Sequence, residues 1–339
     1  MKDFMLFLAV LTVSLTALTE DYKITKDNFV QAETTKYYMI TTMKAGGANK
    51  WRHFFNPPAT DNQPIVRMNR DTLYSTAVVD TSKGGTIFIP EVPKGMYVSV
   101  HYVNEDHVSY DMIYKTGEIP VPTDTTKFMF VNIRFGLKDI NDKDEIKMIN
   151  DLQNKLKINV KSRDEYKSKY PDIKKLAAAT EVVKEELLIK VNDLKLADSA
   201  YMFGTPDYTK PEYHLMGVAY GWGGATYKDN IYQYSPFIKS NKGHSTTFPD
   251  PKNTGGFWSF TVYNSQGFMY NDKATLNSNI AKPNADGTFT VRFGCPGQEN
   301  NIPIKGHDGS WNVLVRHYTP SDRVKELKID PSKTIKPIK

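Results

Sequence analysis

Two clusters of charged side chains in the first third of the chain have the residue types that polar-ligand chemistry requires. The first is Arg67, Arg70 and Asp71, which open a β-rich run that ends at Asp80. Arginine offers a planar fork of donors and aspartate offers two acceptor oxygens, so these residues can clamp one another or a polar ligand. We predict a substrate-binding role for Arg67 and Arg70 and a catalytic role for Asp71. The alternative is a structural network that braces the start of a strand.

The second cluster is His101, Glu105, Asp106 and His107, at the end of a predicted strand. Two imidazoles and two carboxylates can supply a general acid and base, or ligands for a divalent metal ion. We predict Glu105 and His107 as catalytic residues, and His101, Asp106 and His107 as metal-ligand candidates. No His-Glu-x-x-His spacing is present to identify a metal. The alternative is a turn in which Asp106 accepts backbone amides and His107 packs.

Three aromatic residues complete the predicted site. Tyr74 follows the arginine cluster, whereas Trp51 and Trp222 lie in predicted loops, where an indole can stack on a sugar ring. We predict a substrate-binding role for all three. Polar clusters at strand ends gather at the rim of a β-sandwich. We therefore expect one concave surface, with Trp51 or Trp222 nearby, to hold Arg70, Asp71, Glu105 and His107.

The elements that would position these residues are mainly strands. Apolar and polar residues alternate with a period of two in segments 65–80, 85–90, 96–104, 107–115 and 127–135, and again in 257–263, 288–293 and 311–318. Short strands with regular turns are typical of an antiparallel sandwich or jelly roll. Segment 202–251, rich in Tyr, Gly and Pro, is predicted as irregular loop.

Helical periodicity marks three other segments. The first begins near Asp27 as N-cap and ends at Gly46, and the second begins at Asp142 and runs to Leu156. The third spans 173–196. We therefore predict a mainly β (α+β) protein with a helical insert and two antiparallel β-sandwich or jelly-roll-like units. Its parts are a signal peptide (1–19), an N-terminal unit (20–138), a helical insert (139–200) and a C-terminal unit (201–339).

Composition indicates an exported protein. Lys2 precedes an apolar run from Phe4 to Leu18, which is short for a membrane span and typical of a signal peptide; a buried helix or an uncleaved anchor is the alternative. We expect a periplasmic or secreted protein without stable membrane insertion after cleavage. The net charge is +6, with dispersed lysines, so no nucleic-acid partner is predicted. A single cysteine, Cys295, excludes an intrachain disulfide.

Several motifs carry a resemblance to known families. The N-terminal half contains Asn69-Arg70-Asp71-Thr72-Leu73-Tyr74 and Asn104-Glu105-Asp106-His107. The C-terminal half contains Gly256-Phe257-Trp258-Ser259-Phe260-Thr261-Val262-Tyr263, Gly267-Phe268 and Asn284-Ala285-Asp286-Gly287. The first pair resembles the bacterial family known as domain of unknown function 1254, and the others resemble its usual C-terminal partner, domain of unknown function 1214.

The resemblance extends from about residue 36 to about residue 328. It implies two β-sandwich units similar to tandem jelly rolls, such as those of a peptide-N-glycosidase, and it implies no settled activity or catalytic residues. His101 is a departure, because members often carry Gln near that place. Two hypotheses of function stay open. One is a metal-assisted hydrolase acting on a polar, glycan or cell-envelope substrate. The other is a non-catalytic module that binds a small molecule or glycan or assembles, for instance as a homo-oligomer.

Overall fold

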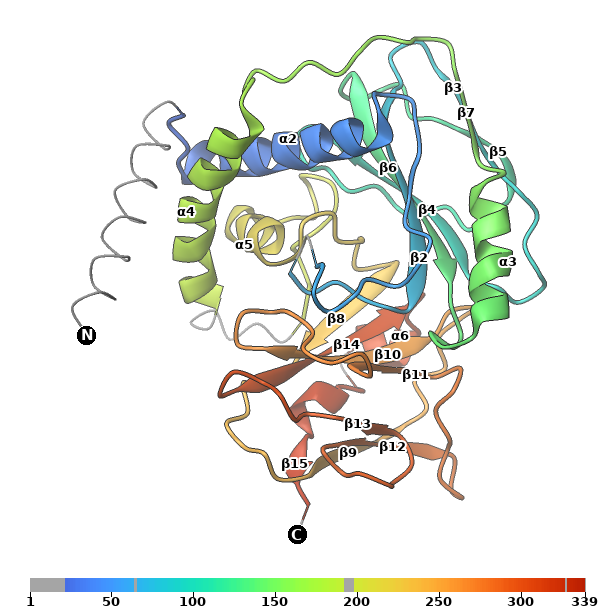
Figure 1. Ribbon diagram of the computed structural model, residues 1–339, viewed down its shortest axis with the longest axis vertical. Helices are drawn as coiled ribbons and strands as arrows, with labels where there is room; N and C mark the ends of the chain where they lie inside the picture. The colour runs from blue at the N-terminus through green and yellow to red at the C-terminus, as the bar shows by residue number, and fades with distance from the viewer. Residues whose placement is uncertain (1–21, 64–65, 192–197, 327, 339) are drawn as a thin grey trace.

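The computed structural model describes residues 22–338 apart from 64–65, 192–197 and 327. The predicted signal peptide therefore lies outside the described residues. In the part of the chain that is described, no helix combines the length and apolar character needed to cross a membrane. Figure 1 shows two β units, one above the other, with most of the helices gathered beside the N-terminal unit.

The N-terminal unit contains two antiparallel sheets, with strand orders β1-β2-β6-β4 and β5-β3-β7. Its strands are β1 (Arg52–His53), β2 (Thr72–Asp80), β3 (Gly85–Ile89), β4 (Val98–Asn104), β5 (Gly117–Pro120), β6 (Phe128–Gly136) and β7 (Lys157–Val160). The apolar core between the two sheets is completed by residues of helix α3 (Lys143–Gln153). Leu73 and Val79 of β2 lie in this core, so Tyr74 and Thr76, one step along the pleat, face the other side of the sheet.

The C-terminal unit also contains two sheets, with strand orders β11-β10-β14-β8 and β13-β12-β9-β15. Its strands are β8 (Asn230–Tyr234), β9 (His244–Pro249), β10 (Trp258–Asn264), β11 (Thr275–Asn277), β12 (Thr288–Phe293), β13 (Asn301–Ile302), β14 (Trp311–Tyr318) and β15 (Lys336–Pro337). A short helix α6 (Asp322–Lys325) and a 3-10 turn η1 (Pro331–Lys333) follow β14. The predicted fold class is confirmed: the protein is mainly β, with four antiparallel-rich sheets in two β units.

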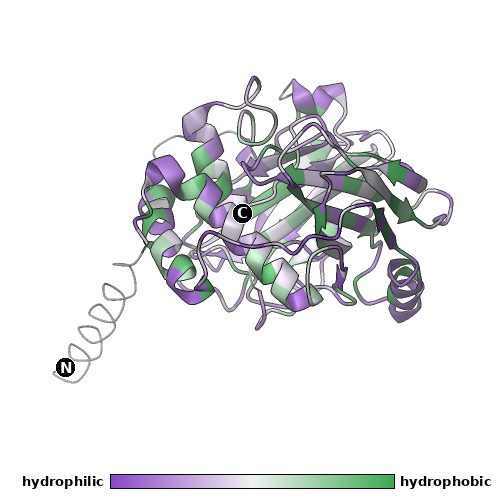
Figure 2. Ribbon diagram, turned by 90° about the horizontal axis from the view of Figure 1, so that it is seen from above, coloured by the Kyte–Doolittle hydropathy of each residue, from purple (hydrophilic) through white to green (hydrophobic). Residues whose placement is uncertain are grey.

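Three helices, α2 (Lys26–Ala45), α4 (Ile173–Val191) and α5 (Pro211–Gly221), pack on one another and on the second face of the β2–β6–β4 sheet. They cover only one end of that face, where Val78, Val103 and Phe130 join their apolar core. Figure 2 shows hydrophobic and hydrophilic residues interspersed along the helices and strands. The rest of this sheet face is polar and lies opposite the C-terminal unit.

Several element ends follow the predicted signals. Gly46 ends α2 with φ 79°, a left-handed conformation that glycine adopts without strain. Asp142 caps α3 by accepting from the amides of Asp144 and Glu145, as expected. The cap of α2 is Thr25 rather than Asp27, because Thr25 precedes the first helical turn with an extended backbone.

Two predictions of secondary structure are wrong. Segment 202–251 is not a continuous loop, because it contains α5, β8 and β9; Pro211 at the first turn of α5 and Glu212 beside it were the available signals. Segment 107–115 forms no strand of its own and makes only isolated bridges at Ser109 and Ile113. His107 and Ser109 of this segment bond to the loop after α5, whereas Tyr110 and Ile113 pack against the core of the N-terminal unit.

Candidate functional site

A cavity of about 170 Å³ lies between the two β units. One wall is the polar face of the β2–β6 pair, the opposite wall is β8 and β14, and the end of α5 with the following loop closes one side (Figure 1). Aromatic residues are the largest group among the lining residues, which also include three arginines and three asparagines. No aspartate, glutamate, histidine, lysine, serine or cysteine is among the lining residues.

On the N-terminal wall, strand register places polar residues side by side. Arg134 of β6 pairs with Tyr74 of β2 and Ser99 of β4, so these three form one row across the sheet. In the neighbouring row, Asn132 of β6 lies between Thr76 of β2 and His101 of β4. Because all of these side chains are on one face of an otherwise apolar sheet, they form a buried polar floor.

This floor contains many buried polar atoms without a partner. Among the described residues, no hydrogen-bond partner is found for Arg134 Nε, Asn132 Oδ1, Thr76 Oγ1, Ser99 Oγ and His101 Nδ1. Ser99 Oγ lies near the Tyr97 hydroxyl but not in hydrogen-bonding geometry. Buried polar groups are normally hydrogen-bonded, and each exception costs about 1–3 kcal/mol. Three of these residues, Arg134, Asn132 and Thr76, also line the cavity, so a bound molecule there could supply partners for their atoms.

The C-terminal wall repeats the same row. Register places Arg316 of β14 between Tyr232 of β8 and Ser259 of β10, and Arg316 also lines the cavity. Here both terminal nitrogens of the guanidinium donate to protein oxygens. Its Nη1 donates to Thr261 Oγ1 (3.1 Å), and its Nη2 donates to the Tyr263 hydroxyl (2.8 Å) and to a backbone carbonyl of the 66–69 loop (2.7 Å).

Arg134 has no comparable partners. Its side chain is buried, with 5% of the residue exposed, and the one hydrogen bond it makes among the described residues runs from Nη1 to Met112 Sδ (3.7 Å). A thioether sulfur is a weak acceptor, and a guanidinium stays protonated even when buried. Tyr74 lies beside it, and its hydroxyl accepts from Asn69 Nδ2, so the phenol proton is free to donate into the cavity. Arg134 is therefore a buried cation without an anionic partner.

The third lining arginine, Arg67, has a left-handed backbone (φ 57°) in the loop before β2. Its guanidinium lies 4.0 Å from the ring centroid of Tyr220 and donates from Nη1 to Asn312 Oδ1 (3.4 Å). Its carbonyl is the backbone acceptor of Arg316. Arg67 thus joins α5 to the C-terminal sheet at one side of the cavity, through a cation–π contact rather than an ion pair.

His107 holds the wall formed by Trp222 and Gly223. The Gly223 amide donates to His107 Nε2 (3.0 Å), so the ring proton is on Nδ1, which donates to His214 Nε2 (2.9 Å). Burial, and then the neighbouring imidazoles of His214 and His101, hold the pKa of His107 well below its usual range, so the ring is neutral. His107 has 0% exposure and does not line the cavity. His107 therefore supports the loop that contains Trp222 and Gly223, and that loop lines the cavity.

The predicted cluster of Arg67, Arg70 and Asp71 does not form. Asp71 is fully buried and accepts from Ser259 Oγ (2.6 Å), Thr275 Oγ1 (3.3 Å) and the Tyr318 hydroxyl (3.3 Å), all in the C-terminal unit. Burial raises the pKa of Asp71, against the opposing effects of Arg316 and these hydroxyls. As a correction to the predicted cluster, Asp71 joins the N-terminal unit to the C-terminal unit through these hydrogen bonds.

Arg70 bonds elsewhere, to the backbone carbonyl (2.6 Å) and carboxylate (3.6 Å) of Asp272. Arg70 and Asp71 lie in the bend just before β2, and their side chains bond to different segments of the C-terminal unit. Of the predicted cluster, only Arg67 lines the cavity.

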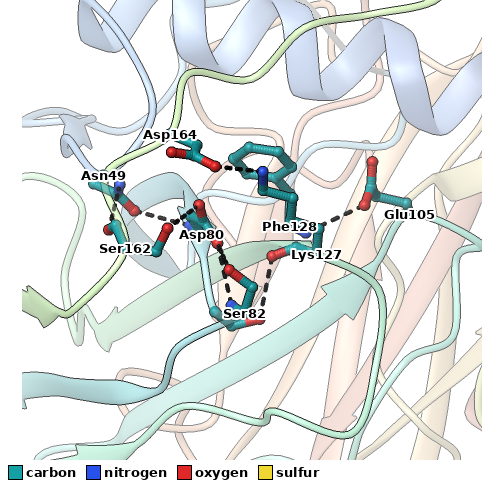
Figure 3. A network of polar contacts seen from close by, with 9 residues as sticks. Asn49, Asp80, Ser82, Glu105, Lys127, Phe128, Ser162 and Asp164 are labelled. Carbon is teal, nitrogen blue, oxygen red and sulfur yellow. Dashed lines mark hydrogen bonds and ion pairs between the residues drawn. The ribbon is translucent and has the colours of Figure 1, made fainter.

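Glu105 and Asp106 lie at the far end of β4. Glu105 accepts from the Phe128 amide (3.2 Å), as Figure 3 shows beside the hydrogen bonds of Asp80 with its neighbours. Burial raises the pKa of Glu105. Asp106 is exposed and accepts from Gln31 Nε2 (3.0 Å), and the amides of this turn bond to Asn104 Oδ1 instead. The expected convergence of Arg70, Asp71, Glu105 and His107 on one concave surface is not observed, because none of them lines the cavity.

The metal-ligand candidates are also separate. His101 Nε2 donates to Ser109 Oγ (2.6 Å), whose own proton goes to the Gly224 carbonyl (2.9 Å). Within the described ranges no three His, Cys, Asp or Glu side chains are grouped so that they could hold a metal ion. His101, Asp106 and His107 therefore do not make a shared metal site in this part of the chain.

Of the three predicted aromatic residues, two line the cavity and one does not. Tyr74 and Trp222 line the cavity, whereas Trp51 packs against the core of the N-terminal unit and does not. The sequence interpretation missed Arg134 and Arg316. Each is an arginine in the middle of a long, otherwise apolar strand, and that position was the available signal, because a charge in a buried strand requires a partner or a function.

Comparison with known proteins gives a family match for the C-terminal unit. Residues 235–322 match a family described as a protein of unknown function, DUF1214. The matched segment includes β10 and β14, and therefore Arg316, but not Arg134. No match is found among curated proteins.

Two solved structures are similar to the whole chain. The VPA0106 protein from Vibrio parahaemolyticus has 15% sequence identity and a TM-score of 0.66, over 96% of this chain and 100% of that one. An uncharacterised protein from Burkholderia cenocepacia has 15% identity and a TM-score of 0.53, over 93% of each chain. At these identities the likeness shows a shared fold with both β units.

Proposed function

We propose that this protein is a binding module, and that the cavity between its β units holds a small anionic molecule. Arg134 carries the proposal. Burying an unpaired ion costs several kcal/mol, so a cation in this position is retained where something negative offsets it. The Asn132 amide, which makes no hydrogen bond to the described residues, and the Tyr74 hydroxyl supply further polar contacts beside Arg134.

Binding is favoured over hydrolysis by the cavity lining. General acid–base catalysis uses mainly His, Asp, Glu, Lys or Cys within hydrogen-bond reach of the reacting atoms, and the lining residues include none of these. Tyrosine is the remaining lining type that can act as a general acid or base, but its usual pKa is about 10, and burial raises the pKa of Tyr220 and Tyr318 further. The groups assigned to catalysis on sequence grounds, Asp71, Glu105 and His107, each have protein partners outside the cavity.

Thermal unfolding of the full chain at low salt tests the proposal. Acetate, benzoate, phosphate and sulfate are compared with neutral glucose, which represents the glycan alternative. We expect at least one anion to stabilise the wild type by about 2.7 kcal/mol at 100-fold its Kd. The same anion should have no effect on Arg134→Met.

Arg292→Met is the matched control, because Arg292 lies on β12 away from the cavity and bonds only to a backbone carbonyl. It should respond to anions as the wild type does. Stabilisation by glucose but by no anion would reject the anionic ligand and favour a sugar.

Two further assignments belong to the same proposal. We assign residues 20–138 to a unit like domain of unknown function 1254, on the strength of motifs 69–74 and 104–107. We also propose export to the periplasm or the medium, supported by the apolar run that follows Lys2. Mass spectrometry of the exported fraction tests it, and a chain that retains Met1 there would contradict removal of the signal peptide.

A further inference from the structure

The class of anion can be narrowed, on the premise that the proposed cavity site is correct. Arg134 Nη1 is directed to Met112 Sδ, while Nε and Nη2 make no hydrogen bond within the described residues. The unused side of the guanidinium is thus its Nε–Nη2 edge. Two parallel donors on one edge match the two oxygens of a carboxylate, which arginine binds in bidentate geometry.

The surroundings favour a single negative charge. Helix α5 ends at Gly221, which lines the cavity, and Trp222 is its C-cap. The C-terminal end of a helix carries roughly half a negative charge, which disfavours a dianion such as a phosphate monoester. Arg316 is less available as a second anchor, because both of its terminal nitrogens already donate to protein oxygens and the Asp71 carboxylate lies close to its charge. A monocarboxylate satisfies Arg134 without excess charge.

The body of the ligand is set by the size and walls of the cavity. Its volume of about 170 Å³ is close to the ~150 Å³ of an engineered cavity that binds benzene. Trp222 forms a flat wall held from behind, because it stacks on Tyr37 at 4.4 Å and donates from Nε1 to Thr34 Oγ1 (3.1 Å). Phe130 meets Trp222 edge-on at 4.9 Å. Trp222 and Phe130 thus form one rigid aromatic wall, against which an aromatic ring of the ligand can pack.

The remaining polar groups point to a substituent on that ring. The side chains of Asn132 and Asn230 make no hydrogen bond to the described residues, and neither does Thr76 Oγ1, although all three residues line the cavity. An amide oxygen left without a donor costs free energy that a hydroxyl or amino group on the ligand recovers. A plain hydrocarbon ring would leave these groups unsatisfied.

We infer that the cavity binds a small aromatic monocarboxylate carrying a hydroxyl or amino group. Its carboxylate accepts from the Nε–Nη2 edge of Arg134, its ring packs along Trp222 and Phe130, and its polar substituent bonds to the asparagine amides. The ligand is a single substituted ring rather than an oligosaccharide or a nucleotide, because a cavity of this volume admits little more.

Isothermal titration calorimetry of the full chain tests this inference. The probes are para-hydroxybenzoate, benzoate, para-hydroxybenzyl alcohol, acetate and phenyl phosphate. We expect one para-hydroxybenzoate per chain. The neutral alcohol, and para-hydroxybenzoate with Arg134→Met, should each bind roughly 10- to 150-fold more weakly, the range for a hydrogen bond to a charged group. Arg292→Met should leave the affinity unchanged.

Asn132→Leu tests the substituent. It should weaken para-hydroxybenzoate by about two- to tenfold, as for a neutral hydrogen bond, and should leave benzoate little changed. If Arg134→Met does not fold, the comparison of acid and alcohol on the wild type decides the role of charge. Equal affinity for the two would then reject the carboxylate.

The outcomes separate the two proposals. Acetate binding as tightly as benzoate, or phenyl phosphate binding more tightly than benzoate, both dependent on Arg134, would overturn the aromatic monocarboxylate and leave an anion site. Absence of any Arg134-dependent anion binding would overturn the proposed function itself.

Discussion

Arg134 and Arg316 occupy equivalent places in the two β units but have opposite environments. Each lies on an inner strand of a four-stranded antiparallel sheet, with a tyrosine on one neighbouring strand and a serine on the other. Arg316 donates to three oxygen atoms and lies close to the Asp71 carboxylate. Within the described ranges, Arg134 donates only to the Met112 sulfur.

The two rows share one arrangement, but the Arg316 row has a structural role and the Arg134 row has the role that we propose in ligand binding. Asp71 and the Arg67 carbonyl come from the N-terminal unit, so the Arg316 row joins the two units. Among the described residues, no oxygen atom of the C-terminal unit accepts a hydrogen bond from the Arg134 guanidinium. Proteins retain buried groups that cost stability where a ligand repays them. The unsatisfied row is therefore the one on which the proposed ligand binding depends.

The largest expected effect comes from removing each arginine in turn. Arg316→Met leaves Asp71 buried without its cation and removes three hydrogen bonds, so it should destabilise the fold by about 3–5 kcal/mol. Arg134→Met removes a buried charge that has no anionic partner, so stability should stay within about 1 kcal/mol of the wild type or rise. Urea unfolding of the two variants measures both.

Arg292→Met controls for the substitution itself, since Arg292 bonds only to a surface backbone carbonyl. Equal losses of stability in Arg134→Met and Arg316→Met would show that both rows are structural, and the comparison would fail.

Ser259 and Ser99, the serines beside Arg316 and Arg134, allow the same test with a smaller expected effect. Ser259 Oγ donates to the Asp71 carboxylate at 2.6 Å, so Ser259→Ala should cost roughly 1.5–3 kcal/mol, the range for a hydrogen bond to a charged group. Ser99 Oγ has no hydrogen-bond partner among the described residues, so Ser99→Ala should be neutral or slightly stabilising. Both are buried Ser→Ala changes in strands, and each is the control for the other. A larger loss from Ser99→Ala would contradict the assignment.

The smallest expected effect is on pH dependence. Burial, and then the charge of Arg134, hold the pKa of His101 well below its usual range. A depressed pKa in the folded state stabilises the protein above the unfolded pKa of about 6.5, and this contribution is lost as pH falls below it. Arg134→Met raises the folded pKa of His101, so less stability should be lost on acidification.

One pKa unit corresponds to about 1.4 kcal/mol, and we expect a difference of that order or less. It is measured by urea unfolding at several pH values from about 6.5 downward, because the two profiles separate only as the pH approaches the folded pKa of His101. His317 is an internal reference, because burial alone lowers its pKa, to about 3. Arg316→Met should therefore leave the pH dependence due to His317 unchanged. Identical pH profiles for the wild type and Arg134→Met would show that the charge of Arg134 does not reach His101.

Local sequence signals predicted the elements well where the chain alternates regularly. β2, β4 and β6 lie within predicted segments or within one residue of their ends, since apolar side chains at every second position need one buried sheet face. Gly46 and Asp142 behaved as helix-end signals, because their effect is confined to one helical turn. Segment 202–251 was misjudged, because its many tyrosines and glycines weaken every local preference even where α5 forms.

The candidate site was predicted less well. Charged residues close together in sequence, such as Arg70 and Asp71, were predicted to form one cluster, yet the bend before β2 brings their side chains to different partners. His107 was placed near function for its acidic neighbours, but it supports the cavity wall through Gly223. Tyr74, Trp222 and Arg67 do line the cavity, each because its segment borders the space between the units.

By itself, the sequence determined the β-rich class, the two β units and most strand positions, because burial periodicity is a property of neighbouring residues. Only the tertiary structure decided which arginine is satisfied. Arg134 and Arg316 both read as charges within apolar strands, and their different environments arise from hydroxyls, a carboxylate and a sulfur contributed by distant segments. The free energy of a buried charge depends on those partners and on exclusion of water, and both are fixed only when the sheets pack together.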